Sequence, residues 1–161
     1  MLNYPLLNFC GINLWVSNKK TLPFKFVDLY LNSLCMSILP INNIKLIDIN
    51  YYKKIKNLYN KMLTVLELNV DQLSKIEIYY KPQQIFSERD KQLLTEKLLI
   101  YCPKMIIVFG DLEFLDYKLL DLHKIIIKHI LHPEHLLSNI KDKVTAYNGL
   151  LQCKQQLIIN A

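Results

Sequence analysis

Two stretches of the sequence combine a buried-strand pattern with residue types that could do chemistry. The apolar run at 105–109 is followed by Gly110 and Asp111, and a second apolar run over 124–132 ends at His132. Ligand sites in parallel sheets lie just beyond the carboxyl ends of the strands. An aspartate or a histidine there could activate water or stabilise a developing charge. These two positions are therefore the first candidates for a functional site.

Other features of the sequence argue against a metal or cofactor at these positions. Four histidines surround the second run, namely His123, His129, His132 and His135. A zinc site needs three or four converging ligands, and this segment has neither an H-E-x-x-H motif nor a nearby cysteine. Three isolated glycines cannot form a P-loop or a G-x-G-x-x-G turn, and the sequence contains no G-x-S-x-G motif. We therefore expect ordinary hydrogen bonds from the histidines, no metal and no cofactor, and a helix cap rather than a general base at Asp111.

The composition predicts one folded domain in a reducing cytoplasm. The chain has 161 residues, of which 52% are hydrophobic, enough for one core. The net charge of +6 suits an anionic partner, but the lysines are spread over many segments, so a nucleic-acid-binding module is less favoured. The four cysteines form no C-x-x-C pair, and no apolar run approaches the roughly 20 residues that span a bilayer. We expect a cytoplasmic protein with no membrane partner.

The apolar patterns predict alternating strands and helices. A continuous apolar run favours a buried strand, and apolar residues at three- and four-residue steps favour a helix. We expect one or two strands, at 34–39 and 44–49, on either side of a turn at 40–43, and further strands at 76–80, 105–109 and 124–132. Helices are expected at 51–68, at 87–101 and from Pro133 onward.

Two helices carry more specific predictions. Ser87, with Asp90 three residues later, is expected to cap the second helix. The face of the last helix expected to be buried consists of Leu137, Ile140, Val144, Tyr147 and Leu151. The order of elements predicts an α/β fold, a single three-layer domain with a mostly parallel central sheet flanked by helices. An N-terminal docking segment is expected in addition, from the residues that precede the polar stretch at 17–21.

The first 16 residues are strongly apolar and include Trp15, the one tryptophan of the chain. Tryptophan is enriched among binding hot spots because its rigid ring fills a partner's pocket. Trp15 could equally fix the N-terminus to the core of its own domain. Two interpretations stay open: a docking segment at 1–22 ahead of a domain at 23–161, or a leading helix packed on that domain.

Three short motifs resemble the psi subunit family of the bacterial DNA polymerase III holoenzyme. They are the segment Gly11-Ile12-Asn13-Leu14-Trp15, the strand end at 106–110, and the stretch 132–137 followed by Lys141, Lys143 and Ala146. The resemblance implies a domain similar to uracil-DNA glycosylase, in which 108–110 matches a strand end and 131–133 matches the His-Pro loop. The glycosylase loop that carries the water-activating aspartate has no counterpart, because the corresponding region reads Ile-Leu-Pro-Ile-Asn-Asn at 38–43.

The resemblance also implies two protein partners and no catalysis. The N-terminal segment of that family docks on the tau/gamma subunits of the clamp loader, which makes Leu7, Gly11, Ile12 and Trp15 the expected contact residues. Its globular domain binds the chi subunit, which engages single-stranded DNA-binding protein. The expected function is a non-catalytic accessory subunit that bridges tau/gamma and chi.

The main alternative is an active DNA glycosylase or a related nucleobase-processing enzyme. In that interpretation His132 is the electrophilic group, and Asp48 or Asp111 activates water. Base flipping requires a pocket that stacks and hydrogen-bonds the extruded base. The sequence has no recognisable motif for such a pocket, so the accessory-subunit interpretation leads.

Overall fold

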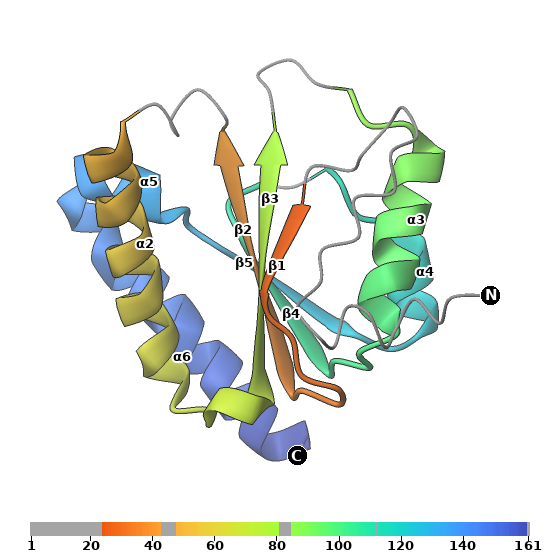
Figure 1. The fold of residues 1–161 in the computed structure, drawn as a ribbon. Coiled ribbons are helices and arrows are strands. Elements are labelled where there is room, and N and C mark those ends of the chain that lie inside the picture. The colour runs from red at the N-terminus through yellow and green to blue at the C-terminus, as the bar shows by residue number, and fades with distance from the viewer. Residues whose placement is uncertain (1–23, 43–47, 81–84, 112, 161) are drawn as a thin grey trace.

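A five-stranded sheet forms the middle layer of the structure (Figure 1). The structure is a computed structural model that describes residues 24–42, 48–80, 85–111 and 113–160. The strand order is β1-β3-β2-β4-β5, with β1 antiparallel to β3 and every other neighbouring pair parallel. The strands are β1 (Phe24–Asp28), β2 (Cys35–Asn42), β3 (Leu73–Tyr80), β4 (Met105–Phe109) and β5 (Ile126–Ile130).

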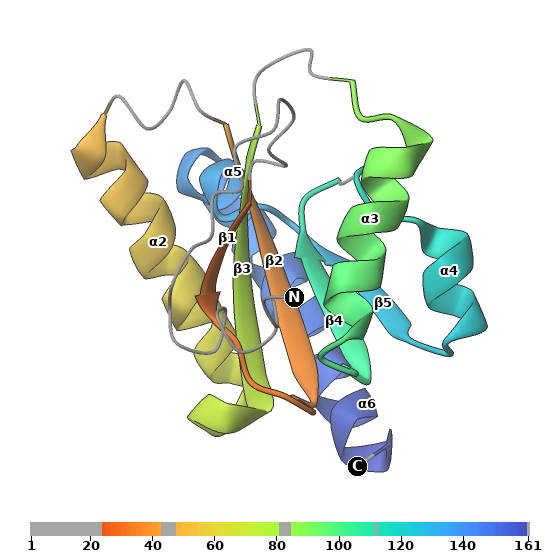
Figure 2. The same ribbon diagram turned by 45° about the vertical axis from the view of Figure 1, so that its right-hand side comes forward.

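Helices cover both faces of this sheet (Figures 1 and 2). One face is covered by α2 (Ile49–Leu63), α5 (Pro133–Ser138) and α6 (Lys143–Asn160), and the other by α3 (Glu88–Leu99) and α4 (Tyr117–Leu122). Short 3₁₀ turns follow α2 (Thr64–Leu66), precede β3 (Val70–Gln72) and precede α6 (Ile140–Asp142). The predicted α/β fold with a mostly parallel sheet between helical layers is therefore confirmed. None of the described helices has the length and apolar character needed to cross a membrane.

The core is divided into two clusters by the sheet. In β4, Met105, Ile107 and Phe109 pack toward α2 and α6, whereas Ile106 and Val108 pack toward α3 and α4. All five side chains are fully buried. A strand buried on both faces has to be apolar at every position, which explains why this strand was predicted with both ends correct.

β2 is longer than the sequence predicted. It continues through Pro40 to Asn42. The prediction of a turn at 40–43 is therefore wrong for residues 40–42, which belong to the strand. The pairing of β2 with β4 ends at Ile38 and Val108. Because Pro40 lies beyond that pair, its missing N–H interrupts no bond between these two strands.

The prediction of a strand at 44–49 is wrong for its last two residues, Asp48 and Ile49. Ile49 begins α2, and the carboxylate of Asp48 accepts hydrogen bonds from the backbone N–H groups of Asn50 (3.0 Å) and Tyr51 (3.1 Å) as the N-cap. The rest of that prediction, 43–47, lies outside the described residues.

The remaining strand and helix predictions differ from the structure mainly at their ends. The predicted helix 51–68 corresponds to α2 and its following turn, and the strand predicted at 76–80 extends back to Leu73. The strand predicted at 124–132 is confined to 126–130. β1 and α4 were not predicted.

The last predicted helix is divided, and its buried face was predicted wrongly. Pro133 does begin a helix, but α5 ends at Ser138 and a 3₁₀ turn separates it from α6. The residues that α6 buries are Ala146, Leu150, Cys153 and Leu157. Ile140, Val144 and Tyr147, which belong to the predicted face, are exposed instead.

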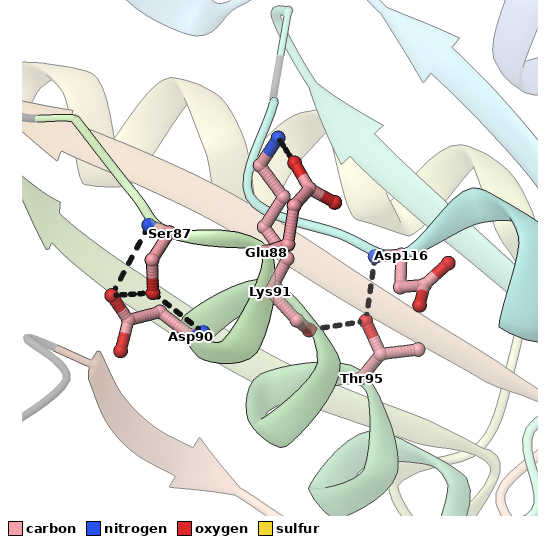
Figure 3. Close-up of polar contacts among 6 residues, drawn as sticks. All are labelled: Ser87, Glu88, Asp90, Lys91, Thr95 and Asp116. Atoms are coloured by element: carbon pink, nitrogen blue, oxygen red, sulfur yellow. Dashed lines mark hydrogen bonds and ion pairs between the residues drawn. The ribbon is translucent and has the colours of Figure 1, made fainter.

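Hydrogen bonds fix α3 at its start and along its length (Figure 3). Ser87 and Asp90 form the predicted cap, in which each side chain accepts a hydrogen bond from the other residue's backbone N–H. The fully buried Thr95 hydroxyl donates to the Lys91 carbonyl and accepts from the Asp116 N–H, both at 2.8 Å. Since Asp116 caps α4, Thr95 connects the two helices of this layer.

We expect Thr95→Val to lower the free energy of unfolding by about 1–3 kcal/mol, because it leaves the Asp116 N–H without its partner at nearly constant side-chain volume. Urea unfolding followed by circular dichroism measures the change. Thr145→Val, at an exposed position of α6, is the control and should change stability by less than about 0.5 kcal/mol. Equal effects of the two substitutions would contradict the bridging role of Thr95.

Candidate functional site

A cleft of about 450 Å³ lies at the carboxyl ends of the parallel strands. Its lining includes Pro40 from β2, Gly110 and Asp111 after β4, and His132 after β5. Carboxyl ends of neighbouring parallel strands meet at one edge of the sheet. The two positions predicted from the sequence as candidates for chemistry are therefore brought together.

His132 is bonded within the domain through both ring nitrogens. Its Nδ1 accepts a hydrogen bond from the Glu134 N–H at 3.1 Å, as the N-cap of α5. Its Nε2 therefore carries the proton and donates to the Pro40 carbonyl at 2.7 Å. Burial lowers the pKa of His132 below its ordinary value, and the opposing effects of the Pro40 carbonyl and the Glu134 charge are smaller. The imidazole is accordingly neutral.

Gly110 allows the ends of β4 and β5 to approach closely. Its φ is 94°, in the region that favours glycine. Its N–H donates to the Ile130 carbonyl at 2.7 Å, and a Cβ at this position would lie 3.4 Å from the Cβ of His132. A larger residue at 110 would therefore disturb the support of His132.

The two aspartates of the glycosylase alternative have different environments. Asp48 caps α2 through its carboxylate. Asp111 is exposed and borders the cleft. The prediction that Asp111 caps a helix is wrong, because α4 begins later and its N-cap is Asp116, which accepts from the Leu119 N–H at 3.1 Å.

The neighbouring histidines make ordinary hydrogen bonds. The Nε2 of His135 lies 2.7 Å from the Asp142 carboxylate, and the Nδ1 of His129 lies 3.2 Å from the Gly110 carbonyl. Among the described residues, no group of three or more His, Cys, Asp or Glu side chains is placed to hold a metal ion.

A buried charged cluster between β3 and α2 was missed by sequence reasoning. Glu77 of β3 is only 2% exposed. Its carboxylate accepts hydrogen bonds from Lys56, Tyr79 and Tyr52, the last at 3.1 Å. Burial opposes ionisation of Glu77, but these bonds and the Lys56 charge outweigh it and hold the pKa of Glu77 below its ordinary value. A lone glutamate between Ile76 and Ile78 was the available signal, since buried carboxylates need partners.

The residues predicted to contact the clamp loader, Leu7, Gly11, Ile12 and Trp15, lie outside the described residues. No protein-family model matches the chain, and no curated protein matches it. The resemblance to the psi subunit family therefore stays a prediction.

We expect His132 to make the domain less stable as the pH falls from 7.5 to 5. Below its ordinary pKa of about 6.5, the unfolded chain binds a proton at this residue more readily than the folded chain. The free energy of unfolding then decreases by up to about 1.4 kcal/mol per pH unit.

Urea unfolding at several pH values measures this effect. His132→Gln should be less stable than the wild type at pH 7.5 and should lose this part of the pH dependence. His123→Gln, at the exposed end of α4, is the control and should retain it. An unchanged pH profile in His132→Gln would contradict the neutral, doubly bonded imidazole.

We expect Glu77→Gln to lower the free energy of unfolding by about 3 kcal/mol at pH 7, because it leaves the Lys56 ammonium without its buried counter-charge. The lowered pKa of Glu77 means that its contribution is present above about pH 4.5 and is lost as the pH falls through the folded-state pKa. The difference in the free energy of unfolding between wild type and variant should therefore become smaller in acid. Glu96→Gln, on the exposed side of α3, is the control and should differ little from the wild type at any pH. A difference for Glu77→Gln that does not change with pH would argue against an ionised Glu77.

Proposed function

We propose that this protein is a non-catalytic accessory subunit of the replicative DNA polymerase clamp loader. In this role the segment 1–22 docks on the tau/gamma subunits, and the domain at 23–161 binds the chi subunit. Chi in turn engages single-stranded DNA-binding protein. The motifs around Trp15 and His132 support the proposal through their resemblance to the psi subunit family.

The hydrogen bonding of His132 is the observation that carries the proposal. A glycosylase-like enzyme would direct this imidazole at the extruded base as an electrophile. Here its two nitrogens bond to Pro40 and to Glu134. A ligand could reach either nitrogen only by breaking a bond that joins β2, β5 and α5. This geometry supports a structural role for the imidazole and favours an interaction protein over an enzyme.

The proposed mechanism is bivalent binding. A short apolar segment with one large aromatic anchor docks in a groove of the first partner, while the attached domain holds the second partner. Joining two binding sites in one chain raises the effective concentration of each partner near the other. The protein then increases the lifetime of the assembly without any chemical step.

We expect Trp15→Ala to weaken binding to the tau/gamma subunits by about 2 kcal/mol or more, because truncation removes the anchor. This corresponds to a loss of roughly 30-fold in affinity. Isothermal titration calorimetry with purified tau/gamma and purified chi measures both interactions. Binding to chi and the thermal unfolding temperature should not change, and Asn13→Ala in the same segment should retain affinity for tau/gamma.

Three results would contradict the proposal. Unfolding of the domain by Trp15→Ala would mean that Trp15 fixes the N-terminus to its own core. Failure of the wild type to bind tau/gamma and chi would overturn the function inferred from the family resemblance. Release of uracil from single-stranded DNA by the wild type, but not by His132→Ala, would establish the glycosylase alternative.

A further inference from the structure

α6 carries a second line of apolar residues that the described part of the domain leaves largely exposed. Val144, Tyr147, Leu151 and Ile158 follow one another at steps of three, four and seven residues along the helix. Val144, Tyr147 and Ile158 are 66%, 50% and 66% exposed, and Leu151 is half-buried. We refer to these four residues as the α6 stripe. Single exposed apolar residues are common, but a line of them set by the helical repeat marks an interaction surface.

The spacing of the α6 stripe fits a second helix. Apolar residues that alternate at three- and four-residue steps form the seam by which two helices pack together. Lys154 occupies the one seam position between Leu151 and Ile158, and its ammonium pairs with Glu67 at 2.7 Å. α6 has 18 residues and is therefore about 27 Å long. The stripe extends over most of this length, enough for several turns of a partner helix.

The charges beside the α6 stripe indicate an acidic partner. Residues 143–160 include no aspartate or glutamate. Lys141 and Lys143 are exposed at the end of the stripe where Val144 lies, and the one carboxylate between them, Asp142, is bonded to His135 at 2.7 Å. Carboxylates on a partner would be attracted to this end, whereas a second copy of the chain, with its own net charge of +6, would be repelled.

We infer that the α6 stripe is the docking surface for the chi subunit, through an amphipathic helix of chi that carries carboxylates beside its apolar face. This inference rests on the proposed function, which includes binding of chi by the globular domain but names no surface. Tyr147 is 50% exposed and lies about one helical turn from Val144, toward the end of the stripe near Lys141 and Lys143. A large, rigid aromatic residue is the usual anchor of an interface.

The test is titration calorimetry of the full-length chain with purified chi. Tyr147→Asp replaces the largest exposed side chain of the stripe by a charge and should weaken binding at least 10-fold. Val144→Asp should do the same, and it is the safer variant for folding because helices tolerate a carboxylate in the first turn. The control is Leu122→Asp, a residue that is 78% exposed on α4, on the opposite face of the sheet. Its affinity for chi should stay within 2-fold of the wild type, and circular dichroism checks that each variant is folded.

The possible failures are distinguishable. If both stripe variants bind chi as well as the wild type does, the docking surface is wrong and the proposed function stands. If the wild type binds tau/gamma but not chi, the chi part of the proposed function fails, and this inference fails with it.

Two further measurements identify other occupants. Sedimentation equilibrium that shows a wild-type dimer, dissociated by Tyr147→Asp but not by Leu122→Asp, would mean that a second copy covers the stripe. The fluorescence of Trp15 can also be measured with no partner added. A shift in Tyr147→Asp but not in Leu122→Asp would mean that the N-terminal segment of the same chain covers the stripe. Either result would overturn the inference.

Discussion

The domain depends on the parallel pairing of β2 with β3 on one side and with β4 on the other. Seven of the eight residues of β2 are buried, and a parallel strand with both faces buried needs a helical layer on each side. The pairing therefore accounts for the position of α2, α5 and α6 on one face and of α3 and α4 on the other. It also brings Pro40, Gly110 and His132 to the same edge of the sheet, so the cleft follows from the architecture and needs no separate cause.

Polar side chains inside the domain form hydrogen bonds that fix the positions of the packed elements relative to one another. The Ser37 hydroxyl on β2 bonds to the Tyr59 hydroxyl on α2 at 2.5 Å, and the Ser74 hydroxyl on β3 donates to Ser33 at 2.9 Å. Glu77 joins β3 to α2 through Lys56. Buried polar groups are costly without partners. A displacement of α2 along the sheet would separate Ser37 from Tyr59 and Glu77 from Lys56, a cost that apolar contacts alone would not impose.

The sequence was informative wherever a pattern had one structural solution. The apolar run at 105–109 suited a strand buried on both faces, Ser87 with Asp90 suited the start of a helix, and both predictions are confirmed. For the last helix the sequence left two possible buried faces, because α6 carries two lines of apolar residues. Periodicity favoured the line with larger residues, whereas the structure buries the line of Ala146, Leu150, Cys153 and Leu157. Gly149 lies beside the buried line, where a Cβ would be 2.8 Å from the Ile130 side chain of β5, so the close approach of α6 to the sheet depends on a glycine at this position.

The candidate site shows a different limit of sequence reasoning. The positions of Gly110 and His132 could be predicted, because they follow apolar runs along the chain. The partner of the His132 ring could not, since Pro40 is 92 residues away in the sequence. That partner decides how the imidazole is used: both of its nitrogens bond inside the domain, and burial keeps it neutral. The cleft thus has its histidine directed inward, whereas the α6 stripe presents apolar area to solvent. Covering apolar area stabilises a complex, which is the physical reason for placing the inferred docking surface on α6.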